Sequence, residues 1–184
     1  MKAGIRFVAV ASGPINDRKR ALIVGVVGRE GVIEGVLSGN VEVDGEDSTA
    51  RIIRMVKRSR FNNQIRLVVL NGIALAGLNV VDVPRLERAL KIKAVVLTRN
   101  RPRPSLLVRA LNRFSKENGK NVKKRIALVD EQARVESALS FGFHLQSSVE
   151  KADIKKLAKP MFEILRVAHL IARGVETGES RGRI

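Results

Sequence analysis

The chain has no cysteine, tryptophan or tyrosine, and only six phenylalanines occur among its 184 residues. Without cysteine there are no disulfide bonds, no thiolate metal ligands and no cysteine nucleophile. So few aromatic side chains argue against a binding surface on which successive bases stack. No apolar run reaches the roughly 18 residues that a membrane-spanning helix needs, and the first residues lack the features of a secretory signal peptide. We therefore expect a cytoplasmic protein that does not contact membranes.

Acidic residues are scarce in comparison with basic ones. The chain has 35 lysines and arginines against 18 aspartates and glutamates, a formal charge of +17 and a pI near 11.3. This excess produces a positive field that attracts polyanions, most commonly nucleic acid. A basic scaffolding protein without catalytic activity, associated with ribosomes or chromatin, is an alternative interpretation of the same charge.

The first half of the chain has the patterns of alternating strands and helices. A short apolar run at 5–11 predicts a buried strand, and two β-branched runs that meet at residues 28–31 predict an antiparallel hairpin. The next expected elements are a helix near Asp47, a strand at 65–71, a helix that begins near Pro84 and a strand at 93–98. This alternation of strand, helix and strand predicts locally parallel strands.

The second half predicts mainly helices. One is expected to begin after a proline pair and to stop at Gly119, and part of 120–140 is also expected to be helical. A weak strand at 141–148 precedes two terminal helices, which we expect Pro160 to separate because proline interrupts helical hydrogen bonding. The order of these elements is that of a ribonuclease-H-like α/β fold, a mixed central sheet flanked by helices, in one domain over residues 1–184.

In such a fold, the ends of the central strands bring carboxylates together, and two Mg²⁺ ions held there can cleave a phosphodiester. The first strand ends at Ala11-Ser12-Gly13, without an acid, and the strand at 65–71 ends at Asn71. An alternative interpretation of Asn71-Gly72 is the turn of a β-hairpin, because this dipeptide between apolar runs is a typical hairpin signal.

One acidic cluster remains near an expected strand end. It lies in the segment "VEVDGEDST" and contains Asp44, Glu46 and Asp47. Carboxylate oxygens are the ligands that Mg²⁺ prefers. Aspartates are equally common in turns and at helix N-termini, so a turn followed by a helix cap is the alternative interpretation of this segment.

Two groups of basic residues are candidate phosphate contacts. Arg166 and Arg173 lie three residues before and four residues after His169, so the three residues share one face of the last expected helix. The other group follows the strand at 93–98, and α/β sheets usually bind ligands beyond the carboxyl ends of their strands. A solvated basic surface is the alternative in each case. The candidates are Arg99, Arg101, Arg103, Arg166 and Arg173.

Four segments together resemble an archaeal family of endonuclease V homologues called endonuclease dU. The segments are "VEVDGEDST", "VVLNGIALAGLNVVDV", "KAVVLTRNRP" and "LRVAHLIARGVETGESRGR", in this order along the chain. The resemblance extends from about residue 5 to residue 183. It implies a ribonuclease-H-like fold and metal-dependent cleavage of DNA near deaminated bases, chiefly deoxyuridine. It also favours a catalytic-type strand over a hairpin at Asn71.

The resemblance is incomplete at the positions that would bind metal. The family's first strand ends in Asp-Asp-Gly, where this chain has Ala11-Ser12-Gly13, and the family's strand-four aspartate is Asn71 here. The motif Asp-Gly-x-Asp-x-Thr is intact from Asp44 to Thr49. The resemblance further implies roles for Arg99 and His169, and for the tail motif at residues 178–182. Asp47, with Asp44, is then the implied metal ligand, and Asp47 and His169 are the implied catalytic residues.

These observations leave three hypotheses for function. The first is a DNA-binding member of the family, with RNA as the alternative partner, whose catalysis is impaired by the loss of two carboxylates. The second is an active hydrolase of DNA repair that uses Asp47, Asp44 and a weakly bound Mg²⁺ or Mn²⁺. The third is the basic scaffolding protein. The sequence does not specify the lesion or the oligomeric state.

Overall fold

The computed structural model describes residues 4–15, 19–149 and 151–180, without the side chains of 151–153 and 156. Residues 181 and 182 of the predicted tail motif lie outside the described residues. Within the described part, every helix is too short or too polar to cross a bilayer.

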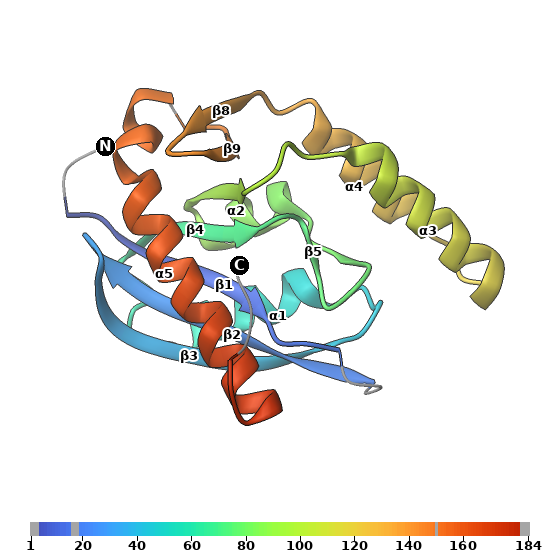
Figure 1. The fold of residues 1–184 in the computed structure, drawn as a ribbon, viewed down its shortest axis with the longest axis horizontal. Helices are drawn as coiled ribbons and strands as arrows, with labels where there is room; N and C mark the ends of the chain where they lie inside the picture. The colour runs from blue at the N-terminus through green and yellow to red at the C-terminus, as the bar shows by residue number, and fades with distance from the viewer. Residues whose placement is uncertain (1–3, 16–18, 150, 181–184) are drawn as a thin grey trace.

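A mixed seven-stranded sheet forms the centre of the structure (Figure 1). Its strands, in spatial order, are β3 (Val32–Glu42), β2 (Arg20–Arg29), β1 (Arg6–Ser12), β4 (Ile65–Asn71), β7 (Lys93–Thr98), β9 (Phe143–Ser147) and β8 (Ser137–Ser140). The first three strands along the chain pair antiparallel. β1, β4 and β7 are mutually parallel neighbours. The predicted antiparallel meander and the predicted parallel central strands are therefore confirmed.

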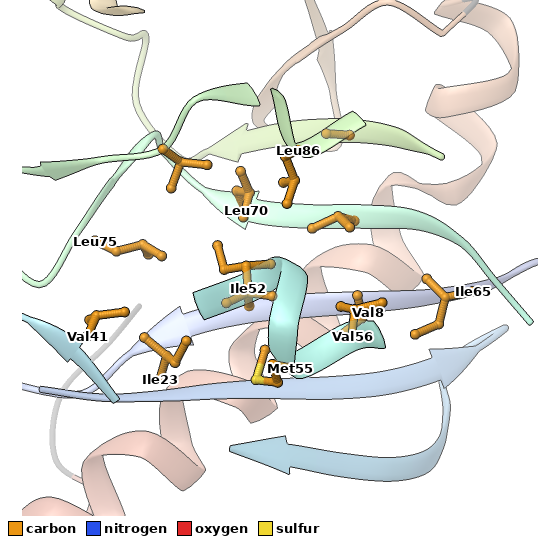
Figure 2. Packing of buried hydrophobic residues seen from close by; sticks show 14 of the residues in the cluster. Val8, Ile23, Val41, Ile52, Met55, Val56, Ile65, Leu70, Leu75 and Leu86 are labelled. Carbon is orange, nitrogen blue, oxygen red and sulfur yellow. The ribbon is translucent and has the colours of Figure 1, made fainter. Parts of the chain in front are cut away.

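Helices cover both faces of this sheet. The helices are α1 (Ser48–Lys57), α2 (Val83–Leu90), α3 (Pro104–Asn118), α4 (Lys123–Ala133) and α5 (Lys151–Thr177). On one face, Ile52 and Val56 of α1 and Leu86 of α2 pack against Val8 and Leu70 of the central strands (Figure 2). Side chains of α5 bury the opposite face. The α3–α4 pair projects away from the end of the sheet (Figure 1).

Alternation along β1 and β4 decides which side chains meet which helices. In β4, Val68 and Leu70 belong to the core beneath α1 and α2, while Leu67 and Val69 belong to the core beneath α5. Because successive side chains of a strand point to opposite faces, Asn71 points toward the α5 side. These branched aliphatic runs are buried on both faces, as expected for parallel central strands.

The segment after β4 is a small hairpin, but its turn is not at Asn71-Gly72. Asn71 is the last residue of β4 and pairs in register with Leu97 of β7. The hairpin is formed by β5 (Ala74–Leu75) and β6 (Asn79–Val80), and its turn lies at 76–78. The strand interpretation of Asn71 is thus confirmed.

The predicted break at Pro160 is wrong. One continuous helix, α5, runs from residue 151 to residue 177 with Pro160 inside it. An internal proline removes one helical hydrogen bond and costs roughly 3 kcal/mol. Buried side chains on both sides of it, including Ala158 and Met161, pack against the sheet. This burial outweighs the local cost, because each fully buried aliphatic side chain contributes about 1.5–3 kcal/mol.

Candidate functional site

The two positions that lack a carboxylate lie side by side. β1 and β4 are parallel, and Val10 pairs in register with Leu70, so Ala11 and Asn71 are the next residues on adjacent strands. Ala11 is almost completely buried and packs in the cluster that contains Ala168 and Ala172 of α5. Both positions therefore face α5 at the carboxyl ends of the two central strands.

Asn71 is joined to the imidazole of the last helix. Its Nδ2 lies 2.8 Å from His169 Nε2, across 98 residues of sequence. Burial, and after it the positive charge of Arg173, lowers the pKa of His169 below its ordinary value. The neutral imidazole can accept a hydrogen bond from the amide N–H through an unprotonated Nε2. The pair is thus a neutral hydrogen bond in which the amide donates.

Asp47 is held by three donors at the start of α1. Its Oδ1 accepts from the backbone N–H of Glu42 at 3.0 Å and from Asn79 Nδ2 at 2.9 Å. Its Oδ2 accepts from Arg51 Nε at 2.8 Å. Partial burial raises the pKa of this carboxyl, but the hydrogen bonds from Arg51, Glu42 and Asn79 outweigh it and leave the pKa below its ordinary value. The carboxylate is therefore ionised, with both oxygens in use.

Asp44 has a similar bracing role. It has a positive φ of 54°, and its Oδ1 accepts from the backbone N–H of Leu78 at 2.7 Å. Gly77 leaves room for this contact, since a Cβ there would lie 2.2 Å from Asp44 Oδ1. Thr49 completes the motif, because its Oγ1 accepts from the N–H of Asp82 at 2.9 Å. The three residues of the intact motif thus tie the start of α1 to the segment between β5 and α2.

Sequence reasoning missed two residues of this hydrogen-bond network, which joins the start of α1 to the segment between β5 and α2. Asn79 is fully buried, donates to the carbonyl of Glu42 and to Asp47, and accepts from the N–H of Ser48. Arg125 of α4 is only 3% exposed and donates through Nη1 to the carbonyls of Asp44 and Leu78. The one available signal was a polar residue, Asn79, within an otherwise apolar run.

The predicted basic residues lie on two parts of the surface. Arg99, Arg101 and Arg103 follow β7. Arg166 and Arg173 flank His169 on α5. All five are exposed. Arg166 also forms a 3.1 Å ion pair with Glu163. The members of this set are Arg99, Arg101, Arg103, Arg166 and Arg173.

A mainly apolar cavity of about 210 Å³ lies next to the end of β4. Gly72 and Ile73 form part of its wall, together with Arg103 and the two prolines beside it. Gln146 also lines it and donates its amide nitrogen to the carbonyls of Gln132 and Val135, which leaves the amide oxygen as an acceptor. The cavity therefore adjoins the basic loop after β7 and lies on the sheet face opposite the Asn71 side chain, because Val96 in its wall belongs to the core beneath α1 and α2.

The residues present do not fit a pair of divalent metal ions. Mg²⁺ prefers carboxylate oxygens in octahedral geometry. Ala11 has no ligand atom, the Asn71 amide nitrogen faces His169, and both oxygens of Asp47 are engaged. Over residues 4–15, 19–149 and 151–180, no three His, Cys, Asp or Glu side chains are grouped so that they could hold a metal ion.

Comparisons with known proteins agree on one family. The family model described as Endonuclease dU matches residues 3–176. A "UPF0215 protein" of Methanothermobacter thermautotrophicus is 36% identical over 192 residues, which cover 99% of this chain and 93% of the relative. The crystal structure of a protein of unknown function from Archaeoglobus fulgidus is 30% identical, with a TM-score of 0.82, and the match covers 93% of this chain and 98% of that chain.

A more distant similarity concerns the fold alone. The crystal structure of Ciona intestinalis endonuclease V in complex with an inosine-containing DNA has a TM-score of 0.50 and 8% identity. The match covers 85% of this chain and 77% of that chain. Together with the strand order, these similarities confirm the predicted α/β fold with an endonuclease V-like mixed central sheet.

Proposed function

The chain belongs to the endonuclease dU family, and from this membership we propose that it binds nucleic acid, foremost DNA, with impaired phosphodiester cleavage. One observation carries the proposal. Ala11 and Asn71 are neighbours at the ends of the two central strands, where the family resemblance implies aspartates. Their replacement removes about two negative charges from a place where cation-assisted hydrolysis would need them.

The contact between Asn71 and His169 supports impaired cleavage independently. The amide donates to the imidazole, so Asn71 Nδ2 and His169 Nε2 are already paired with each other. A carboxylate at position 71 would instead accept from a protonated imidazole or bind a cation. The native pair is thus arranged for mutual hydrogen bonding rather than for charge.

Charge and surface shape support binding. The formal charge is +17. Exposed arginines follow β7, and others flank His169 on α5, so positive groups lie on both sides of the strand ends. The cavity beside the basic loop after β7 has mainly apolar walls, which suit a planar base better than a phosphate.

An active nuclease built on Asp47 and Asp44 receives less support. Asp47 would have to release Arg51 or Asn79 to bind a cation, and Asp44 would have to release the N–H of Leu78. An unsatisfied buried donor costs about 1–3 kcal/mol. These acids are therefore better suited to bracing the loop than to catalysis.

The decisive experiment is a nicking assay on duplexes that contain uracil or hypoxanthine, with Mg²⁺ or Mn²⁺. The native chain is compared with the Ala11→Asp/Asn71→Asp variant, and the same variant with His169→Gln serves as a matched control. We expect the native chain to bind without efficient cutting and the double variant to cut faster. If the native chain cuts as fast as the double variant, the missing carboxylates do not limit it, and Asp44, Glu46 and Asp47 become the residues to mutate.

A further inference from the structure

A basic concavity lies on the face of the sheet opposite the side chains of Asn71 and His169. It is a groove of about 350 Å³ between α1 and the edge strand β3, here called the α1–β3 groove. Its floor includes Leu37 and Met55, which belong to the core on the α1 side of the sheet. The residues that line it are Leu37, Ser38, Gly39, Asn40, Arg51, Arg54, Met55, Arg58 and Ser59.

Three guanidinium groups form one wall of the α1–β3 groove. Arg51, Arg54 and Arg58 are spaced by three and four residues, so they share one side of α1. Arg51 is bonded to Asp47. Arg54 and Arg58 are exposed, and within the described part of the chain neither guanidinium has a hydrogen-bond or ion-pair partner. Two cations are thus available to a ligand.

The rest of the groove is open and lacks acids. No aspartate or glutamate lines it. Gly39 leaves its floor uncrowded, since a Cβ there would meet only Ile23, at 3.6 Å. β3 is an edge strand, so alternate backbone N–H groups of residues 37–40 point away from β2. The side chains of Ser38 and Asn40 point to the opposite face of the sheet, because their register partners Val24 and Leu22 pack beneath α5.

We propose that the α1–β3 groove binds the phosphodiester backbone of a nucleic-acid strand, as a second contact separate from the strand ends near His169. The proposal rests on the proposed function in assuming a nucleic-acid partner. From Arg51 to Arg58 the helix rises about 10.5 Å, the length of about three phosphates along one strand of a duplex. Guanidinium groups pair well with phosphate oxygens, and backbone N–H groups complete such sites.

The two contacts face opposite sides of the sheet. α5, with His169, covers one face, and α1, with the groove, covers the other. One nucleic acid must therefore pass around an edge or an end of the sheet to touch both, or two segments must be bound at once. The α1–β3 groove is thus a nucleic-acid site that does not include Asn71 or His169.

The first experiment measures how salt affects binding of a single-stranded oligonucleotide by fluorescence anisotropy. The Arg54→Gln/Arg58→Gln variant is compared with the Arg85→Gln/Arg88→Gln variant, which loses the same charge from exposed positions on α2 that do not line the groove. The log–log slope changes by about 0.7 per lost contact on a single strand. We expect the groove variant to lose about 1.4 of slope and the control to keep the native slope.

A second readout uses the absence of cysteine. In a Gly39→Cys variant the only thiol lies in the groove, where an added Cβ meets only Ile23, and in an Asn112→Cys variant it lies on exposed α3. Bound oligonucleotide should slow alkylation of the first thiol and leave the second unaffected. This readout needs no arginine substitution, so it holds even where the arginine variant folds poorly.

The outcomes separate the two proposals. Native binding that weakens with salt, with equal slopes in both arginine variants and no thiol protection, overturns the groove and leaves the proposed function standing. Absence of salt-dependent binding by the native chain overturns both. Protection of the Gly39→Cys thiol by an acidic peptide but not by an oligonucleotide also overturns the groove proposal and indicates a protein partner.

Discussion

At the scale of single residues, the Asn71–His169 pair shows how one side-chain atom changes the chemistry of a site. An amide nitrogen donates where a carboxylate oxygen would accept. With asparagine, His169 is favoured in its neutral form, because burial and Arg173 also disfavour its charge. With aspartate, the opposite charge would favour the imidazolium. Burial and Arg173 thus favour the neutral imidazole, and the amide of Asn71 is the partner that suits it.

The lowered pKa of His169 predicts a pH dependence of stability. The ordinary value is 6.5, so between the lowered pKa and 6.5 the unfolded chain binds more protons than the folded chain. The partly buried, neutral His169 therefore makes its full contribution to the free energy of unfolding above pH 6.5. This contribution decreases as the pH falls toward the lowered pKa. Urea unfolding between pH 5 and 8 measures it, with His169→Gln as the control that removes the titration. Equal pH dependence in both proteins would contradict the assignment.

Replacement of the buried Arg125 is predicted to lower the free energy of unfolding strongly. Its Nη1 supports the carbonyls of Asp44 and Leu78, and its guanidinium lies 5.1 Å from the ring centre of Phe114. Arg125→Met leaves those carbonyls without a donor, so we expect a loss of about 2–3 kcal/mol of unfolding free energy. Chemical denaturation measures this loss. The neighbouring exposed Lys124→Met should change stability by less than about 0.5 kcal/mol, and equal effects would show that Arg125 is not a brace.

At the scale of elements, β3 depends on glycine at one place and not at another. A Cβ at Gly35 would lie 2.6 Å from Phe61 Cε2, whereas one at Gly39 would lie in ordinary contact with Ile23, at 3.6 Å. Phe61 is mostly buried, and Arg60 stacks on it at 4.8 Å. The bare backbone of Gly35 therefore accommodates the ring that closes this end of the α1 layer.

Two alanine substitutions in β3 test this difference. Gly35→Ala must displace Phe61, and overpacking of this kind costs about 1–3 kcal/mol. Gly39→Ala, on the same strand, should leave the free energy of unfolding unchanged or slightly raised, since alanine reduces the entropy of the unfolded chain. Thermal or urea unfolding of both variants measures the contrast. Loss of stability at Gly39 as large as that at Gly35 would disprove the packing argument.

The continuity of α5 is also decided at the scale of elements. Local chemistry at Pro160 favours a break, but the side chains before and after it belong to one buried surface on the sheet. A sequence pattern shows the proline and the apolar positions but not their common partner. The helix is therefore stabilised by packing rather than by its own propensities.

At the scale of the whole molecule, the charge of +17 predicts the form of nucleic-acid binding. Each phosphate neutralised releases counterions, so log affinity should fall with log salt by about 0.9 per contact on duplex DNA. Arg99→Ala/Arg101→Ala should reduce this slope by up to about two and should weaken all sequences alike. Titrations on uracil-containing and undamaged duplexes measure both effects. Binding indifferent to salt would remove the argument from charge.

The sequence by itself determined the properties that depend on local pattern or on composition. The order of the main strands and helices up to β7, the excess of positive charge and the absence of acids at Ala11 and Asn71 are all visible along the chain. Apolar periodicity reports local structure, and net charge needs no coordinates. The motif from Asp44 to Thr49 was also visible, although not the bonds that it makes.

The tertiary structure decided which distant residues meet. Only the parallel pairing of β1 with β4 brings Ala11 beside Asn71, and only the packing of α5 brings His169 within 2.8 Å of it. One of the three donors to Asp47 is Asn79, a residue 32 positions away. Such contacts depend on sheet order and on which face each helix covers, and a pattern with a period of a few residues contains no information on either.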